Sequence, residues 1–158
     1  MDDLAKRIGE RLKASNAMLV TAESCTGGWV AQAVTSIAGS SEWFERGFVT
    51  YSNASKEELL GVSPSTLKKH GAVSEETARA MAGGALARSR GTIALAVTGV
   101  AGPGGGTPEK PVGMVCFAWT TPDGVRSETR NFSGDRDAVR RQSVIRALEG
   151  AMEALGGG

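Results

Sequence analysis

Histidine, cysteine and long apolar runs are all scarce in this chain of 158 residues. One histidine and two distant cysteines offer neither a zinc-ligand pattern nor a disulfide framework. No apolar run reaches the roughly 18 residues that a membrane span requires, and the opening MDDLAKR carries charge where a signal peptide would have its apolar core. We therefore expect a cytoplasmic protein with reduced thiols, no metal, no cofactor and no membrane partner.

An excess of charge of either sign is also missing. The chain has 18 basic and 17 acidic residues, for a net charge of +1, and its basic residues are spread along the sequence. This balance provides no general attraction to nucleic acid or to a membrane surface, so any anion-binding site must be local. The length suits one core, and we predict a single domain over residues 1–158.

Apolar periodicity predicts helices and strands that alternate along the chain. Helices are expected at 2–15, around Val30, Val34 and Ile37, at 56–60, after Pro64, from Ser74 to 86 and at 135–155, and strands at 18–21, 48–51, 93–97, 112–119 and 125–132. The run at 93–97 is apolar without alternation, as in a strand covered on both faces, whereas 125–132 is polar enough to lie at a sheet edge. We predict an α/β fold, a three-layer α/β/α sandwich with a mixed β-sheet.

The segment TAESCTGG at 21–28 joins a predicted strand to a predicted helix and holds two candidate nucleophiles. Ser24 falls near the helix N-terminus, where free N–H groups can hold an oxyanion; it could attack a carbonyl if a base removes its proton, or it could simply cap the helix. Cys25 competes because a helix N-terminus lowers a thiol pKa. Its only potential histidine partner, His70, looks like the charged end of a helix, so we interpret Cys25 as a packing residue.

Without a usable histidine, the base for Ser24 must be a lysine, a tyrosine or a carboxylate. Lys56, in YSNASK at 51–56, could serve if burial or a cationic neighbour lowers its pKa. Tyr51 could relay a proton or orient the substrate. The alternative is a solvated lysine that opens a helix and a tyrosine that fills the sheet. The S-x-x-K spacing of Ser65 and Lys68 lacks its usual partner motifs and is better explained by a capped surface helix.

A glycine-rich loop at 98–111, TGVAGPGGGTPEKP, has the composition of a phosphate cradle. It contains neither a Walker sequence nor the G-x-G-x-x-G spacing of dinucleotide-binding folds. The alternative is a flexible hairpin loop. Three prolines and the polar side chains of Thr98, Thr107 and Lys110 favour a ligand-binding loop.

Two arginines, Arg136 and Arg140, share one face at the start of the last predicted helix. Cations oppose the helix dipole there, and a bound phosphate would reverse that penalty. Asp135 and Asp137 could instead neutralise the arginines locally.

Five segments, in order along nearly the whole chain, resemble the CinA C-terminal domain family: TAESCTGG at 21–28, GFVTYSNASK at 47–56, GAVSEETARAMAGGA at 71–85, TGVAGPGGGTPEKPVGMV at 98–115 and FSGDRDAVR at 132–140. The chain is similar to the stand-alone form, a nicotinamide-nucleotide amidase. The resemblance implies hydrolysis of nicotinamide mononucleotide to nicotinic acid mononucleotide and ammonia. It also implies that Ser24, Tyr51 and Lys56 are catalytic, and it suggests a homodimer.

The resulting hypothesis is acyl transfer, in which Lys56 deprotonates Ser24 and N–H groups near Thr26 and Gly27 stabilise the oxyanion. Contacts to the nucleotide substrate are expected from Thr26, Gly27, Gly28, Thr98, Gly99, Gly102 and Thr107, with Arg136 and Arg140 at its phosphate. The competing hypothesis is a non-catalytic nucleotide-binding module, such as a sensor or a competence-related accessory. The pairing of Ser24 with Lys56 favours the enzyme, because binding alone needs no such pair.

Overall fold

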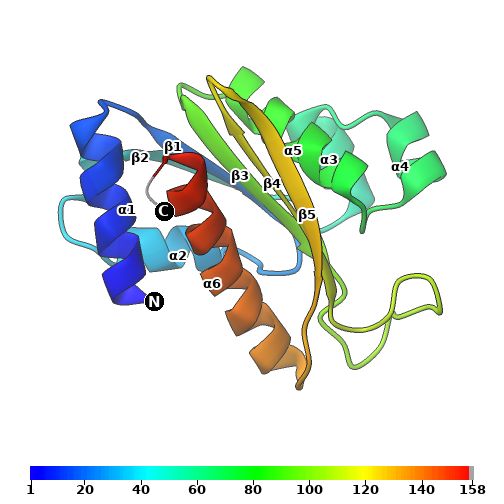
Figure 1. The fold of residues 1–158 in the computed structure, drawn as a ribbon. Helices are drawn as coiled ribbons and strands as arrows, with labels where there is room; N and C mark the ends of the chain where they lie inside the picture. Colours follow the sequence, from blue (N-terminus) through cyan, green and yellow to red (C-terminus); the bar gives the residue numbers. More distant parts are fainter. Residues whose placement is uncertain (157–158) are drawn as a thin grey trace.

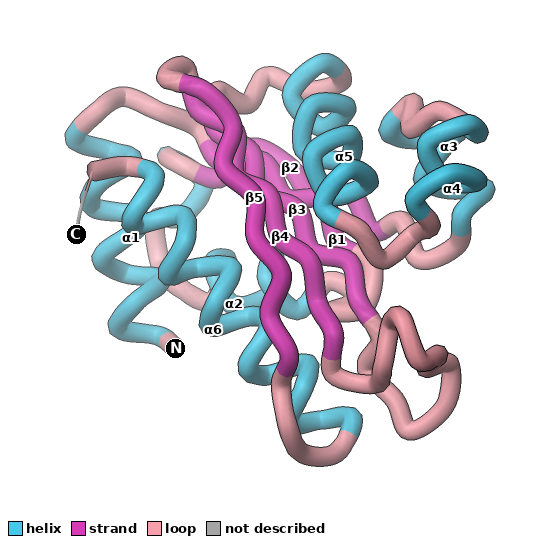
Figure 2. Tube along the Cα trace, turned by 45° about the vertical axis from the view of Figure 1, so that its right-hand side comes forward, coloured by secondary structure: helices cyan, strands magenta, loops and turns pink. Residues whose placement is uncertain are grey.

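In the computed structural model, which describes residues 1–156, a five-stranded sheet lies between two layers of helices (Figure 1). The elements are α1 (Asp2–Ala14), β1 (Leu19–Glu23), α2 (Trp29–Thr35), the 3-10 turn η1 (Ser40–Glu42), β2 (Phe44–Val49), α3 (Asn53–Leu60), α4 (Pro64–His70), α5 (Glu75–Ala87), β3 (Ile93–Gly99), β4 (Met114–Thr121), β5 (Gly124–Asn131) and α6 (Arg136–Ala154). Figure 2 shows α1, α2 and α6 on one face of the sheet and α3, α4 and α5 on the other. This arrangement confirms the predicted α/β/α sandwich.

The sheet is mixed, with the strand order β2-β1-β3-β4-β5. β1 runs parallel to both β2 and β3, whereas β4 is antiparallel to β3 and β5. Glu23, the last residue of β1, lies opposite Val49 of β2 and Val97 of β3. The segments that follow these three parallel strands therefore meet at one edge of the sheet, where ligands of open α/β folds bind.

Side-chain size separates the two faces of the central strand β3. Leu95 and Val97 belong to the core cluster formed with α1, α2 and α6, together with the stacked rings of Phe117 and Trp119. The intervening Ala94 and Ala96 face the opposite cluster, which includes several alanines of α5. Alternate side chains of a strand point to opposite faces, so the small residues let α5 approach the sheet closely. β3 is buried over 93–98, as its unalternating apolar run predicts.

The element boundaries differ from the expected ones mainly around β2. β2 begins at Phe44 and ends at Val49, which differs from the predicted strand at 48–51. The difference arises because FERGFV lies at the sheet edge and is only partly buried, so few apolar residues indicate where the strand starts. Tyr51 therefore lies beyond the strand. α3 begins at Asn53, earlier than expected, because Ser52 and Ser55 form a capping box. α2 ends at Thr35, before Ile37.

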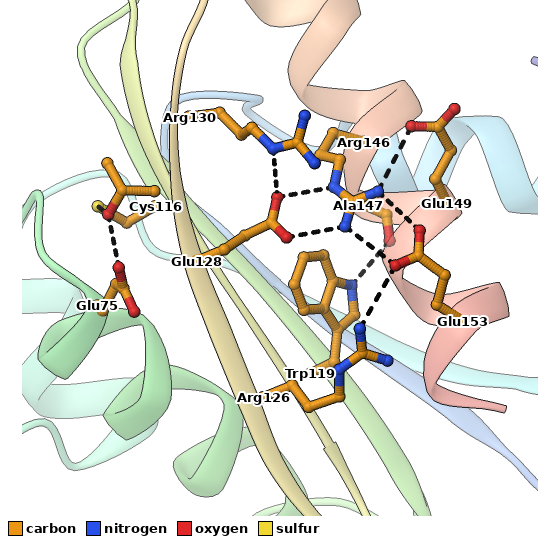
Figure 3. Close-up of polar contacts among 11 residues, drawn as sticks. Glu75, Cys116, Trp119, Arg126, Glu128, Arg130, Arg146, Ala147, Glu149 and Glu153 are labelled. Carbon is orange, nitrogen blue, oxygen red and sulfur yellow. Dashed lines mark hydrogen bonds and ion pairs between the residues drawn. The ribbon is translucent and has the colours of Figure 1, made fainter. Parts of the chain in front are cut away.

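β5 lies at the sheet edge, as predicted, and a network of ion pairs connects it to α6 (Figure 3). Arg146, which is 8 % exposed, places its guanidinium over the Trp119 ring. It donates to both carboxylate oxygens of Glu128 at 2.7 and 2.8 Å and to Glu153 at 2.8 Å. Arg130 pairs with Glu128 on the same strand. These contacts attach an otherwise polar edge strand to the helix that covers it.

No helix among residues 1–156 is long and apolar enough to cross a membrane.

Candidate active site

A cavity of about 300 Å³ lies at the edge where β1, β2 and β3 end. Its lining comes from the segments after these strands, from the approach to α5, and from the start of α6: Ser24, Cys25, Tyr51, Asn53, Lys56, Ala72, Val73, Thr98, Gly99, Val100, Ala101, Gly102, Gly104, Gly105 and Arg136. A larger hollow, of about 520 Å³, lies near Ser15, Thr92 and Asp123 at the opposite ends of the strands. Its lining contains no lysine, histidine or cysteine, whereas the smaller cavity holds both Ser24 and Lys56 and is therefore the candidate site.

Ser24 and Lys56 meet inside this cavity. The Lys56 side chain is 1 % exposed and its Nζ donates a hydrogen bond to Ser24 Oγ at 3.0 Å. Nζ also donates to the backbone oxygens of Thr50 at 2.9 Å and Tyr51 at 3.4 Å. Burial lowers the pKa of Lys56 below its ordinary value. The structure thus excludes the alternative of a solvated lysine and places a buried amine next to a serine hydroxyl.

The turn after β1 is held by Glu23, a residue that the sequence analysis did not single out. Its buried carboxylate accepts hydrogen bonds from Thr26 Oγ1 at 2.6 Å and from the N–H groups of Gly28, Val30 and Ala31 at 3.2, 2.9 and 3.0 Å. The N-cap of α2 is Gly28, which has no side chain to cap the helix. Ser24 is therefore no helix cap, and the amino end of α2 is already occupied by a carboxylate.

The amides of this turn differ in whether they are already hydrogen-bonded. Gly27 and Gly28 have positive φ angles of 60° and 105°, a conformation that favours glycine. In this conformation Gly27 N–H donates to Ser24 O at 3.0 Å, so it is not free for an oxyanion. Within residues 1–156, the N–H groups of Cys25 and Thr26 donate to no other residue. They lie directly after Ser24 in the chain and replace Gly27 as candidate donors.

The two candidate phosphate-binding arginines have different surroundings. Arg140 lies behind the turn, outside the cavity lining, and donates through Nε to Cys25 O and through Nη2 to Thr26 O, both at 3.1 Å. Arg136 lines the cavity and donates to Gly102 O at 2.7 Å and to Tyr51 Oη at 3.1 Å. Of the two arginines, Arg136 thus lies at the cavity, whereas the guanidinium of Arg140 is engaged by the turn.

Comparison with known proteins assigns the chain to a family. The model of the CinA C-terminal domain matches residues 1–155. The chain belongs to this family. It is 56 % identical over 147 residues to the "Nicotinamide-nucleotide amidohydrolase PncC" of Escherichia coli (strain K12), a match that covers 92 % of this chain and 89 % of that protein. The corresponding protein of Pseudomonas putida is 55 % identical, covering 95 % and 94 %.

Solved structures of similar proteins have the same fold. The competence/damage inducible protein CihA of Agrobacterium tumefaciens is 49 % identical, with a TM-score of 0.93, and the match covers 98 % of this chain and 94 % of that one. A CinA superfamily protein of Escherichia coli is 35 % identical, with a TM-score of 0.94, covering 97 % and 89 %. The recognition of the CinA family from the five sequence segments is therefore confirmed.

In this CinA family chain, the glycine-rich loop contributes to the cavity only in part. Thr98, Gly99 and Gly102 line it, and Thr98 Oγ1 donates to Ala72 O at 2.8 Å. Thr107 forms a turn with Lys110 outside the lining. Thr26, Gly27 and Gly28 also lie outside the lining. Asn53, Ala72 and Val73 line the cavity although the sequence analysis did not single them out.

The second candidate nucleophile of this CinA domain, Cys25, lines the cavity with a nearly inaccessible side chain. Cys25 is 5 % exposed within the core, and burial raises the pKa of its thiol to about 12. A neutral buried thiol is a poor nucleophile.

His70 ends α4, where its Nδ1 lies 3.3 Å from a carboxylate oxygen of Glu76. Tyr51, 62 % exposed, does not fill the sheet. Residues 1–156 contain no cluster of three potential metal ligands.

Proposed function

We propose that this chain hydrolyses nicotinamide mononucleotide to nicotinic acid mononucleotide and ammonia, with Ser24 as nucleophile and Lys56 as base. The observation that supports this most strongly is the 3.0 Å contact between the buried Lys56 amine and Ser24 Oγ inside a cavity. The identity of 56 % to an Escherichia coli protein named nicotinamide-nucleotide amidohydrolase supports the substrate. The contact between Lys56 and Ser24 thus supports the choice of reacting groups, and the names of the relatives support the choice of substrate.

A neutral Lys56 amine satisfies all three of its contacts if it accepts from the Ser24 hydroxyl and donates to the other two oxygens. Such an amine has two N–H donors and one lone pair. If the two N–H groups donate to the oxygens of Thr50 and Tyr51, the lone pair is left for the hydroxyl proton of Ser24. Burial favours this neutral form because it lowers the lysine pKa. Proton transfer from Ser24 to Nζ then accompanies the attack of Oγ on the carboxamide carbon.

The tetrahedral intermediate places negative charge on the former carboxamide oxygen. We assign the N–H groups of Cys25 and Thr26 as its donors, since both lie directly after the nucleophile and Gly27 N–H is engaged. Lys56 passes its proton to the amide nitrogen, the C–N bond breaks and ammonia leaves. Water attacks the resulting ester, Lys56 accepts a proton from that water and returns it to Ser24 Oγ, and the acid is released.

Substrate binding is assigned to the open side of the cavity. Among its lining side chains are two basic groups, Lys56 and Arg136, and no carboxylate. Lys56 is occupied with Ser24, so Arg136 is the candidate for the phosphate, with the glycine-rich loop beside it. Tyr51 presents an exposed ring next to Arg136, and an aromatic face attracts a cationic pyridinium. In this assignment Tyr51 orients the substrate.

The test is ammonia release from nicotinamide mononucleotide by purified protein in the presence of a chelator. We expect stoichiometric ammonia and nicotinic acid mononucleotide from the wild type and none from Ser24→Ala. The substitution Ser65→Ala, in the exposed α4 segment, is the matched control and should leave turnover unchanged. Binding of the nucleotide without turnover at high enzyme concentration would instead support the non-catalytic nucleotide-binding module, and complete loss on chelation would refute a metal-independent reaction.

A further inference from the structure

Lys56 is a buried potential cation with no anionic partner among the residues that the structure describes. Its amine contacts only uncharged oxygens, those of Ser24, Thr50 and Tyr51. None of the ion pairs among residues 1–156 includes it. A buried charge is normally paired, because desolvation without compensation is costly.

The carboxylates on the surrounding elements are directed away from this amine. Glu23 of β1 binds the start of α2, Glu75 of α5 binds Ser127 and Thr129 of β5, and Glu76 of α5 pairs with His70. On α3 itself, Glu57 and Glu58 form no ion pair with any residue in the described part of the chain. The other charged or titratable groups nearby are the Cys25 thiol, which burial keeps protonated, Tyr51 Oη with Arg136, and Arg140 behind the turn.

The final step of the proposed reaction creates the missing partner. Ester hydrolysis converts the acyl group and water into a carboxylic acid and restores the Ser24 hydroxyl. A carboxylic acid is a far stronger acid than a lysine ammonium, so its proton moves to the Lys56 amine. The cavity then holds a product carboxylate beside a protonated lysine, and no carboxylate of its lining repels that product.

We infer that protonated Lys56 is the binding site for the carboxylate of the product, so that the enzyme binds the acid nucleotide more tightly than the amide and is increasingly inhibited by its product as pH falls. The inference rests on the proposed function for the identity of the two nucleotides. Below the pKa of Lys56 the acid meets its counter-ion, and above it the acid meets a neutral amine. The amide carries no charge at this position and lacks that dependence.

Calorimetric titration of Ser24→Ala measures this directly, because the amide survives in a variant without the nucleophile. Nicotinic acid mononucleotide and nicotinamide mononucleotide are titrated at several pH values between neutral and alkaline. At the lowest pH of the series, the hydrogen bond between protonated Lys56 and the carboxylate predicts roughly 10- to 100-fold tighter binding of the acid than of the amide. We expect the ratio to approach one as pH rises, and proton uptake on acid binding to appear in buffers of different ionisation heat.

Two further variants, combined with Ser24→Ala, assign the effect to the lysine. Lys56→Met should remove both the preference and its pH dependence, whereas Lys56→Arg, which stays charged, should keep a preference that no longer changes with pH. Lys69→Met, at an exposed position of α4, is the control and should match the parent.

A preference for the acid that is independent of pH, or that survives Lys56→Met, would overturn the inference. Ammonia release by the wild type tests the proposed function separately. Turnover without an acid preference would refute only the inference, and an acid preference without turnover would refute only the amidase.

Discussion

Replacing Arg140 by alanine tests whether the turn after β1, which carries Ser24, is held in place through its carbonyl groups. The guanidinium donates to Cys25 O and Thr26 O, both at 3.1 Å, from outside the cavity lining. These carbonyls belong to the two residues whose N–H groups we assign to the oxyanion. Without Arg140 the turn can rotate, and misaligned donors stabilise the transition state less well.

The magnitude follows from the two hydrogen bonds. A hydrogen bond to a charged group contributes about 1.5–3 kcal/mol. Because Arg140 is partly exposed, we take this range for both bonds together, which corresponds to a loss of roughly 10- to 150-fold in kcat/KM. The loss should appear mainly in kcat, since the contact acts on the reacting groups.

The assay compares nicotinamide mononucleotide with the corresponding nucleoside, which lacks the phosphate. Equal losses on both substrates are expected if Arg140 positions the turn. Arg141→Ala is the matched control, because the Arg141 guanidinium also lies over the Trp29 ring, at 5.3 Å compared with 5.5 Å for Arg140, but makes no contact with the turn. A loss confined to the nucleotide would show that Arg140 reads the phosphate and would refute our reasoning.

Three other predictions follow from the same structure. Cys25→Ser should retain most of the turnover, whereas Ser24→Ala should abolish it, since burial raises the Cys25 pKa to about 12; a dead Cys25→Ser beside an active Ser24→Ala would reverse the assignment. Because burial lowers the pKa of Lys56, kcat/KM should rise with pH as the amine becomes neutral and level off below pH 10.5, the ordinary lysine value; a profile that is flat or falls through this range would contradict Lys56 as base. Arg146→Met should lower the free energy of unfolding by about 1–3 kcal/mol, because Glu128 and Glu153 lose their buried partner and keep only the more exposed Arg130 and Arg126. Urea denaturation measures this, with the more exposed Arg126→Met expected to cost less than about 1 kcal/mol; equal losses would show that burial of Arg146 contributes nothing.

Much of the fold could be predicted because burial leaves a periodic trace in the sequence. The unalternating run at 93–97 indicated the central strand, and the polar segment at 125–132 indicated the edge strand β5. β2 was placed too late because an edge strand with a partly exposed face, FERGFV, has too few apolar residues to reveal where it starts. Capping also moved a boundary, since Ser52 begins α3 before its apolar residues do.

The proximity of Lys56 to Ser24 could be predicted from the types of residue present. The positions of Arg136 and Arg140 could not, because they depend on how one helix lies relative to the turn after β1. The absence of a histidine partner pointed to Lys56, and the structure brings its amine to Ser24. The different placement of Arg136 and Arg140 depends on the position of one helix relative to the turn, and helical spacing alone puts both on one face. One feature of the sequence could have pointed to Glu23. A helix that begins after Gly28 has no side chain at its N-cap, so its first N–H groups need another acceptor, and Glu23 is that acceptor.

Three buried polar residues distinguish this edge of the sheet from the rest of the core. Glu23, Ser24 and Lys56 are all nearly inaccessible, although a stable core would place apolar side chains at such positions. Glu23 is fully hydrogen-bonded and orders the turn, which accounts for its burial in structural terms. The amine of Lys56 is hydrogen-bonded as well, but within residues 1–156 it is a potential cation without an ion pair, and hydrogen bonds to uncharged oxygens compensate a buried charge less fully. Local rules are broken chiefly where function requires it. Burial lowers the pKa of Lys56 beside the Ser24 hydroxyl, and a lowered pKa is the property that the proposed base needs at neutral pH.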